Sequence, residues 1–406
     1  MNSMEDVVYA SCIGVYLYKH MKICHLITRM IVGGAQENTL FTVRGHLENG
    51  HEAILLTGPT SGLEGKLLQE QRVPGLCVEI VDSLTREIVP GKDWVAYKQL
   101  RRYFEANEFD VVHTHSSKAG VIGRIAARKA GVPVVVHTVH GQSFHPYQSG
   151  LKNDLYIRVE KFAAKYCDRI FAVADAMIDQ CVDAGIAPRT KYRTVYSGMD
   201  LEPYLNSETD VELLKSLEIP QGVPVVGKIA RLFELKGHEF LIEAAQDVID
   251  EIGDVRFLII GDGILRSKLE STIRARGLMK YFIFVGLVSP DEIPRYVSIM
   301  NCLVHLSLRE GLPRTVVQAL AGGKPAIGYN LDGTPEVIKD KEFGFVCPPE
   351  STLAVATAIV RLLKNPEMAQ KMGMAGRDFV KEHWDWRRMV TILEHEYEGL
   401  TTDGGV

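Results

Sequence analysis

Short, continuous apolar segments rich in valine and isoleucine alternate with longer segments of helical periodicity along the chain, and this pattern limits the fold more than any other feature. In the first half these segments are KICHLIT (22–28), HEAILLTG (51–58), CVEIVDS (77–83), DVVHTH (110–115), PVVVHTVHG (133–141) and RIFAVA (169–174). Strands that are apolar on both faces belong to parallel sheets covered by helices on both sides. The first half therefore predicts a doubly wound α/β domain.

The same alternation starts again after Pro220 and Gly222. Its apolar segments are VPVVGKIA (223–230), VRFLIIGDG (255–263), YFIFVGLV (281–288), NCLVHLS (301–307), KPAIGYN (324–330) and FGFVCPP (343–349). The intervening residues 201–222 combine proline and glycine with polar residues, as linkers do. We therefore expect an α/β protein with two Rossmann-like doubly wound domains that face each other across a cleft.

The predicted domain boundaries follow from these two series. Residues 21–205 form the N-terminal Rossmann-like domain and residues 222–375 the C-terminal one. Residues 376–406 are predicted to be helical and to pack back on the N-terminal domain. We interpret residues 1–20 as an extension outside the core, because acidic residues precede its short apolar run and Met21 begins a clean strand.

Composition excludes several classes of function. The 406-residue chain has a formal net charge of −5, which gives no general electrostatic basis for binding nucleic acid. Its seven cysteines include no Cys-x-x-Cys pair, which is typical of a reduced, cytoplasmic protein. No apolar run approaches the roughly 18 residues that a transmembrane helix requires, so none is expected.

Ligands of open α/β sheets bind at the carboxyl ends of the strands, so polar or glycine residues directly after strands are site candidates. Gly33 and Gly34 lie between the first strand and the first helix, where backbone N–H groups can approach a phosphate or a sugar. A tight strand-to-helix turn explains this pair equally well. The GDG at 261–263 follows another strand, but Arg266 stands in place of the third glycine of a dinucleotide fingerprint. This argues against a dehydrogenase.

Several histidines lie near the ends of two neighbouring strands, namely His113, His115, His137, His140 and His145. Metal binding is one interpretation, but no cysteine or paired carboxylate lies at ligand spacing, and we expect no metal site. His113 and His137 lie within buried strands and are interpreted as core residues. His140 precedes Gly141 where its strand ends, so it is the best candidate to contact a polar substrate in the cleft.

The segment EGLPRTVVQALAGGKP (310–325) begins where another strand ends. Pro313 fits the first turn of a helix, and the glycines at 322–323 end that helix. The first turn, with Gly311 and Leu312 before it, would face the cleft, where N–H groups without helical partners can cradle a phosphate.

Four polar side chains complete the candidate site. Arg231 and Lys236 lie in the loop after the first strand of the second domain, and two cations at that edge suit a diphosphate. Solvated surface charge is the alternative interpretation for both. Glu310 could accept hydrogen bonds from sugar hydroxyls, and Gln318, about two helical turns further on, could reach a ribose.

Together these motifs resemble those of glycosyltransferase family 4, whose members have the GT-B fold. The resemblance extends from Met21 to about Leu400. In the order typical of the family, the chain carries VGGAQ (32–36), VHG (139–141), RLFELKG (231–237), GDG (261–263), EGLPRTVVQALAGGKP (310–325) and DGTPEV (332–337).

The resemblance implies a retaining transfer of a sugar from a nucleoside-diphosphate sugar, of the UDP or GDP type, to a glycan or lipid-linked acceptor in cell-surface polysaccharide synthesis. Arg231 and Lys236 would bind the donor diphosphate. Glu310 would hold the sugar hydroxyls, and His140 would contact the sugar near the reacting centre. The other donor-binding positions it implies are Gly33, Gly34, Gly263, Gly311, Leu312, Pro313 and, at the ribose, Gln318. The family needs no divalent metal or other cofactor, and the chain has no Asp-x-Asp signature.

The sequence departs from the family's pattern at four positions. Gln318 replaces a glutamate, Ala230 a glycine, Ser197 an asparagine and Asn301 an aspartate. The first matters most, because an amide accepts a weaker hydrogen bond from a ribose hydroxyl than a carboxylate does, by about 1 kcal/mol.

Two alternative functions fit the same fold. A nucleotide-sugar epimerase or a phosphorylase would keep it, but the chain carries no positive signature of either. A non-catalytic nucleotide-sugar-binding protein would be consistent with Gln318. Peripheral contact with a membrane is a further expectation, because the predicted helix at 151–169 is basic, although a solvated helix face is the simpler explanation. Its basic residues are Lys152, Arg158, Lys161, Lys165 and Arg169.

Overall fold

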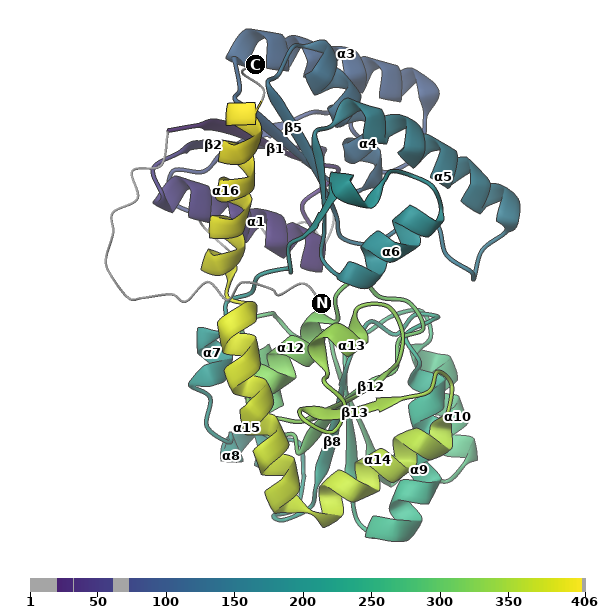
Figure 1. The fold of residues 1–406 in the computed structure, drawn as a ribbon. Helices are drawn as coiled ribbons and strands as arrows, with labels where there is room; N and C mark the ends of the chain where they lie inside the picture. The colour runs from purple at the N-terminus through teal and green to yellow at the C-terminus, as the bar shows by residue number, and fades with distance from the viewer. Residues whose placement is uncertain (1–19, 32, 61–72, 404–406) are drawn as a thin grey trace, which may run out of the picture.

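The computed structural model describes residues 20–31, 33–60 and 73–403. Of the expected N-terminal extension, residues 1–19 lie outside this described part. The chain forms two parallel sheets, each in its own domain, and the two domains lie one above the other in Figure 1. The predicted fold class, two Rossmann-like α/β domains, is confirmed.

The first sheet has seven strands in the order β3-β2-β1-β4-β5-β6-β7. They are β1 (Lys22–Ile27), β2 (Glu52–Thr57), β3 (Cys77–Ile80), β4 (Val111–His115), β5 (Val134–Val139), β6 (Arg169–Ala172) and β7 (Tyr192–Thr194). The order reverses between β1 and β4, which is where ligands bind in such sheets. The apolar pattern does not predict β7, because three residues, YRT, are too few and too polar to show periodicity.

The second sheet has six strands in the order β10-β9-β8-β11-β12-β13. They are β8 (Val225–Ile229), β9 (Arg256–Ile260), β10 (Phe282–Gly286), β11 (Cys302–His305), β12 (Ala326–Tyr329) and β13 (Gly344–Cys347). Here the order reverses between β8 and β11. All the recorded strand pairs in both sheets are parallel.

Helices cover both faces of each sheet. In the first domain they are α1 (Gly34–Glu48), α3 (Pro90–Asn107), α4 (Ser117–Lys129), α5 (Gly150–Ala163) and α6 (Asp175–Asp183). The remaining α-helices are α7 (Glu202–Leu205), α8 (Val211–Ser216), α9 (His238–Ile252), α10 (Arg266–Ala275), α11 (Ile293–Ser298), α12 (Arg314–Ala321), α13 (Thr334–Val337), α14 (Thr352–Lys364), α15 (Pro366–His383) and α16 (Trp386–Asp403). Short 3-10 helices lie at Ala164–Tyr166, Arg189–Lys191 and Met279–Tyr281.

The alternation of side chains along a strand explains why the strands of the first sheet are apolar on both faces. Val112 of β4 packs into the core under α3 and α4, whereas its neighbour Val111 packs with Trp386 and Tyr397 of α16 on the other face. Figure 1 shows α16 beside α1, with α4 and α5 on the opposite side. Each face of the sheet therefore needs its own row of valines and isoleucines.

The chain crosses between the domains near Met199 and again near Asp385, and these two residues form a parallel β-bridge. α7 already packs on α11 and α12 of the second domain, so the first domain ends before the predicted residue 205. α15 packs on α12 and α14, and α16 alone of the last two helices lies on α1 and β5 of the first domain. The predicted boundary at residue 376 therefore falls inside α15. The two helices are separated at Trp384, the C-cap of α15, whose carbonyl accepts a hydrogen bond from the Met199 N–H at 2.9 Å.

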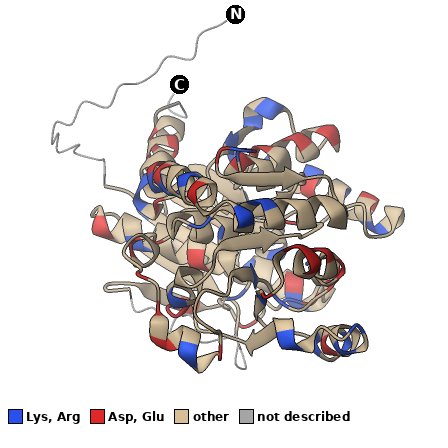
Figure 2. Cartoon of the chain, turned by 90° about the horizontal axis from the view of Figure 1, so that it is seen from below, with Lys and Arg blue, Asp and Glu red and all other residues tan. Residues whose placement is uncertain are grey.

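Within the described part of the chain, no helix is long and apolar enough to cross a membrane. Lysine and arginine are intermixed with aspartate and glutamate along the ribbon in Figure 2. This mixture agrees with the small formal net charge of −5.

Candidate active site between the two domains

An ion pair between Lys236 and Glu310 lies at the carboxyl edge of the second sheet. Lys236 Nζ is 2.5 Å from Glu310 Oε2, and the two side chains are 21% and 23% exposed. Lys236 follows β8 and Glu310 follows β11, so the point where the strand order reverses brings them together. Burial alone raises the pKa of Glu310, but Lys236 and His305 outweigh it and the net shift is downward. The carboxylate is therefore ionised and available to accept hydrogen bonds.

Arg231 lies in the same loop as Lys236 and faces the same cavity. Its guanidinium lies 5.2 Å from the centre of the Phe233 ring, and its carbonyl accepts a hydrogen bond from His238 Nε2 at 3.0 Å. The cavity is about 750 Å³ and is lined by Arg231, Lys236 and Glu310. Its opposite wall is formed by Gly141 and other residues of the first domain. Two predicted cations and the predicted glutamate thus share one cleft.

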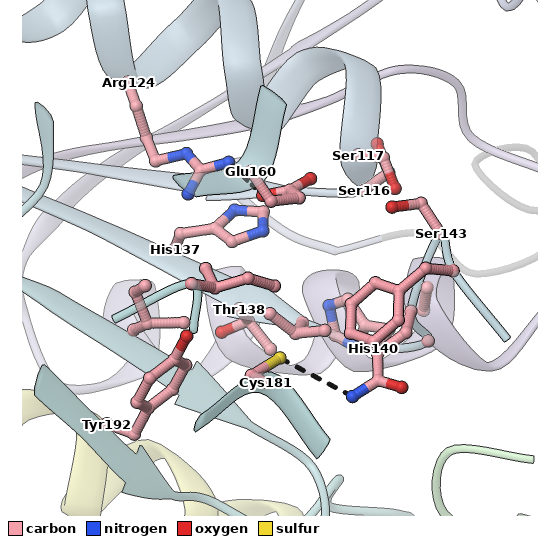
Figure 3. A pocket seen from close by; sticks show the side chains of 17 residues that line it. Ser116, Ser117, Arg124, His137, Thr138, His140, Ser143, Glu160, Cys181 and Tyr192 are labelled. Atoms are coloured by element: carbon pink, nitrogen blue, oxygen red, sulfur yellow. Dashed lines mark hydrogen bonds and ion pairs between the residues drawn. The ribbon is translucent and has the colours of Figure 1, made fainter. Parts of the chain in front are cut away.

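His140 lies on the first domain's side of the cleft. A Cβ on Gly311 would lie 2.5 Å from the His140 carbonyl oxygen, so the backbones of the two domains approach closely here. The imidazole itself lines a smaller cavity of about 290 Å³, shown in Figure 3. Gly141, Gln142 and Phe144 line both cavities, which therefore adjoin. The structure brings His140 to the cleft but does not place its ring in contact with Glu310.

The Gly33-Gly34 turn lies against Arg314, the first residue of α12. A Cβ on Gly34 would lie 2.6 Å from Arg314 Cδ, so only glycine fits without displacing the arginine. Arg314 Nη2 is 2.8 Å from Glu37 Oε2, and Arg314 Nη1 is 2.9 Å from Ser197 Oγ. Arg314 was not predicted from the sequence. Its role depends on Glu37, which is 277 positions away in the chain, so no local signal could reveal it.

Gln318 lies in a different cavity from Glu310. This cavity is about 370 Å³ and is lined by Gln318, Glu37 and Arg314 together with Asp291. Glu310, which precedes α12, and Gln318, about two helical turns further on, thus line separate cavities.

The remaining predicted positions support the loops of the site. Leu312 is buried, and Pro313 is the N-cap of α12 rather than a residue of its first turn, because the helix begins one residue later at Arg314. Gly263 packs on the loop that carries Arg231, since a Cβ there would lie 2.5 Å from the Leu232 carbonyl oxygen.

Polar contacts from the second domain hold the two domains together. Glu336 of α13 accepts hydrogen bonds from the backbone N–H groups of Asp175 (2.8 Å) and Ala176 (2.9 Å) at the start of α6. A carboxylate is favoured at this position because the N–H groups of a first helical turn lack partners. Gln180 Nε2 donates to Asp332 Oδ1 at 2.9 Å. The DGTPEV motif therefore joins the domains next to the cleft.

The predicted core histidines are buried and hydrogen-bonded. His113 Nδ1 lies 2.6 Å from Tyr397 Oη, and His137 Nδ1 lies 3.0 Å from Thr114 Oγ1. His145 lines the cavity of about 750 Å³. His113 and His137 are therefore held by protein groups, as the sequence indicated.

The sequence did not single out His25 of β1, although it completes a cluster with His113 and His115. Their ring nitrogens lie within 4.8 Å of one another, so within the described residues these three could hold a metal ion. Hydrogen bonds to protein groups already engage five of their six ring nitrogens. The geometry therefore describes a hydrogen-bonded network. His25 pairs with His113 across adjacent strands, and only the strand order reveals this contact.

Two family models match the chain, one for each domain. The model described as "Glycosyltransferase Family 4" matches residues 32–203, and the one described as "Glycosyl transferases group 1" matches residues 211–379. The two matches fall on the two sheets described above.

Curated relatives cover most of the chain. A UDP-Gal:alpha-D-GlcNAc-diphosphoundecaprenol alpha-1,3-galactosyltransferase of Escherichia coli is 32% identical over 286 residues, which is 70% of this chain and 73% of the relative. A 2-deoxystreptamine glucosyltransferase of Streptomyces kanamyceticus is 26% identical over 308 residues, 74% of this chain and 79% of the relative. Both names describe enzymes that transfer sugars.

Solved structures show the same fold. HepE of Anabaena in complex with UDP-glucose superposes with a TM-score of 0.79 at 20% identity, covering 94% of this chain and 100% of that one. Sucrose-phosphate synthase of Thermosynechococcus elongatus gives the same TM-score of 0.79 at 20% identity, with 94% and 100% coverage. At these identities the likeness concerns the arrangement of the two domains.

Proposed function

The chain belongs to glycosyltransferase family 4, and we propose that it transfers a sugar, with retention of anomeric configuration, from a UDP- or GDP-sugar to a glycan or lipid-linked acceptor in cell-surface polysaccharide synthesis. It is a glycosyltransferase, and its co-substrate is a nucleotide sugar. The observation that carries the proposal is the Lys236–Glu310 ion pair, which shares a cavity with Arg231.

In this proposal the cations act on the diphosphate. As the acceptor hydroxyl attacks the anomeric carbon, the bond from that carbon to the diphosphate oxygen breaks and its electron pair leaves with the diphosphate. Arg231 and Lys236 neutralise the charge that develops there. The acceptor oxygen bonds to the anomeric carbon on the face from which the diphosphate leaves, which preserves the configuration, and the acceptor proton passes to an oxygen of the leaving diphosphate on that same face.

Glu310 and His140 would position the sugar. The Lys236 ammonium has three donors, so it can keep its bond to Glu310 at 2.5 Å and still donate to a phosphate oxygen. Glu310 would then accept hydrogen bonds from sugar hydroxyls. His140 would contact the sugar from the first domain. Because two cations already face the cavity, we propose that transfer needs no divalent metal.

Nucleotide release from a panel of UDP-, GDP- and ADP-sugars tests this function. We expect turnover of at least one sugar in the presence of EDTA, and a product whose anomeric proton keeps the donor's configuration by NMR. Lys236→Met should lower kcat/KM by roughly 100-fold or more, as the loss of one charge-stabilising donor does. Lys268→Met, at an exposed lysine of α10 in the same domain, is the matched control and should act as wild type.

Three results would contradict the proposal. An inverted product would refute retention, and loss of turnover in EDTA that zinc, magnesium or manganese restores would refute metal independence. Wild-type activity of Lys236→Met would remove the role of the ion pair. Donor binding without turnover on any acceptor would instead favour the non-catalytic alternative.

We propose further that the acceptor is lipid-linked and that the protein rests on the inner face of a membrane through α5. The Escherichia coli relative is named for a diphosphoundecaprenol-linked acceptor. α5 exposes Leu151, Leu155, Val159 and Phe162 at a spacing of three or four residues, and Leu151 is 87% exposed. Such a stripe faces outward, and basic residues of the same helix flank it.

A groove beside α5 suits the head of such an acceptor. It measures about 810 Å³, and its apolar lining includes Leu155 and Val159. Arg86, Lys118 and Lys152 line the same groove, so cations that could bind a diphosphate lie beside apolar side chains that could bind a lipid chain.

Sedimentation with vesicles tests the membrane contact. Wild type should bind vesicles containing phosphatidylglycerol more than vesicles of phosphatidylcholine alone. The double variant Leu151→Ser, Phe162→Ser should lose this binding because its apolar face is gone. Leu353→Ser is the matched control, since Leu353 of α14 is 70% exposed in the second domain. Equal binding of wild type and the double variant would refute the assignment to α5.

A further inference from the structure

Three imidazoles form a continuous hydrogen-bonded row from the cleft into the core of the first domain. His140 Nε2 lies 3.0 Å from His115 Nδ1, and His115 Nε2 lies 3.0 Å from His25 Nδ1. In both pairs the rings are near parallel, with centroids 5.3 Å apart. The row runs across the sheet, because His25 lies on β1, His115 ends β4 and His140 follows β5, three adjacent strands.

The accessible end of the row is His140. His25 and His115 are fully buried, whereas His140 is half-buried and lines the cavity of Figure 3. Since its Nε2 is bonded to His115, Nδ1 is the ring nitrogen left for a ligand. Burial lowers the pKa of all three imidazoles, that of His140 to about 3, so the row is uncharged at neutral pH.

A neutral imidazole has one N–H and one lone pair, so the tautomers in the row are coupled. In one arrangement every ring donates inward, and His140 presents a lone pair at Nδ1. In the other every ring donates outward, and His140 carries its proton on Nδ1. No mixed arrangement satisfies both hydrogen bonds.

The buried end of the row distinguishes these two arrangements. His25 Nε2 is buried and, within the described part of the chain, has no hydrogen-bond partner. Inward donation would leave an unpaired N–H there, whereas outward donation leaves a lone pair. Unpaired buried N–H groups are rarer in proteins than under-used acceptors. The outward arrangement is therefore favoured, with the His140 proton on Nδ1.

The backbone next to His115 is held in a strained conformation. Ser116 has φ 60° and ψ 154°, a combination that residues with a Cβ rarely adopt. Its hydroxyl lies 2.7 Å from Thr28 Oγ1, and the Thr28 N–H donates to it at 3.2 Å. The end of β4 is thus tied to the end of β1, which fixes His115 relative to His25.

We propose that His25 and His115 are positioning residues that hold His140 as the tautomer with its proton on Nδ1, so that His140 offers a fixed N–H donor to a substrate oxygen. The use of this donor rests on the proposed function, in which His140 contacts the sugar. Neither His25 nor His115 touches the substrate in this proposal. An imidazole whose tautomer is fixed can only donate from Nδ1, so it favours ligand atoms that accept a hydrogen bond and disfavours those that donate one.

NMR of the full-length protein labelled with ¹⁵N-histidine reads the tautomer directly, because protonated and unprotonated ring nitrogens have separate chemical shifts. His140→Asn assigns the His140 signals by their loss. We expect a protonated Nδ1 and an unprotonated Nε2 in the wild type. A His140 whose proton is on Nε2 would overturn the proposal. This measurement needs no substrate, so it stands even if the proposed function fails.

His25→Phe breaks the row at its buried end and keeps an aromatic ring. We expect mixed tautomers of His140 and a fall in kcat of about tenfold, the effect of one hydrogen bond, with the donor KM unchanged. His25→Asn, whose amide can donate near the position of Nδ1, should restore most of the activity. His395→Phe, on the exposed face of α16, is the control and should change neither readout.

Each outcome has one meaning. If His25→Phe leaves both the tautomer and kcat unchanged, His25 is not a positioning residue. If His25→Phe does not fold, His115→Asn breaks the row in the middle with a small polar side chain, and the same two readouts apply. If His140→Asn has wild-type kcat, the role of His140 in the proposed function fails, whereas the NMR result for the row still holds.

Discussion

Lys228 is the last residue but one of β8 and is 1% exposed, so it is a buried lysine near the strand end that leads to the candidate site. Burial, followed by the repulsion of Lys236, lowers its pKa from 10.5 to about 7, against the opposing attraction of Glu239 and Glu310. We predict that Lys228→Met, which keeps the length of the side chain and removes its charge, changes how stability depends on pH.

The sign and size follow from the two pKa values. Between about pH 7 and 10.5 the unfolded chain holds a proton that folded Lys228 does not, so the free energy of unfolding rises with pH. The slope approaches about 1.4 kcal/mol per pH unit, and from pH 7 to 9 the increase is about 2 kcal/mol. Below pH 7 both states hold the proton, and the cost of burying the charge remains in full. Lys228→Met has no buried ammonium, so its free energy of unfolding lacks this contribution at every pH.

Urea unfolding at pH 7, 8 and 9, followed by hydrogen exchange of β8 peptides, measures this difference. We expect the variant to be more stable than wild type at pH 7 and its advantage to shrink by about 2 kcal/mol at pH 9. Lys268→Met serves again as the exposed control and should show no such change. Parallel pH curves for wild type and Lys228→Met would show that Lys228 does not titrate in the folded protein in this range.

Three further predictions follow from the site and its supports. Gln318→Glu should lower the donor KM about fivefold at unchanged kcat, because a carboxylate holds a ribose hydroxyl more strongly by about 1 kcal/mol, and an unchanged KM would separate Gln318 from the donor. Gly311→Ala places a Cβ 2.5 Å from the His140 carbonyl oxygen, so the clash should cost about 1–3 kcal/mol of unfolding free energy and the turnover, measured as nucleotide release, should fall by about tenfold. Glu394→Gln weakens the 2.8 Å contact with His46 and should cost about 2–4 kcal/mol of unfolding free energy by urea titration at pH 7. Burial raises the pKa of Glu394, but the hydrogen bond with His46 and its other partners outweigh burial and lower the pKa to about 2. The stability advantage of the wild type over Glu394→Gln should therefore disappear as the pH falls from 4.5 toward 2.

Much of the fold is visible in the chain itself. A strand of a parallel sheet is apolar at successive positions, so segments such as 110–115 and 255–260 can be recognised as strands from their own residues. Residues that follow such strands, including Arg231, Lys236 and Glu310, must then lie at one edge of a sheet. The interdomain cleft and three of its charged residues could therefore be predicted from local pattern alone.

Contacts between distant segments could not be predicted in this way. The Arg314–Glu37 pair and the close approach of Gly311 to the His140 backbone join residues from different domains. The apolar period of α12 placed Gln318 correctly on a helix, yet it opens into a different cavity from Glu310. The apolar periodicity of a helix does not show which cavity or which distant segment each of its faces will contact.

The histidine row shows the same limit inside one domain. The sequence revealed that His115 and His140 end neighbouring strands, but it gave no reason to connect them with His25, 90 positions before His115. That contact exists because β1 and β4 are adjacent where the strand order of the sheet reverses. Alternation of apolar residues selects strands and helices through short-range burial, whereas the order of strands is settled by long-range packing, and the active-site contacts depend on that order.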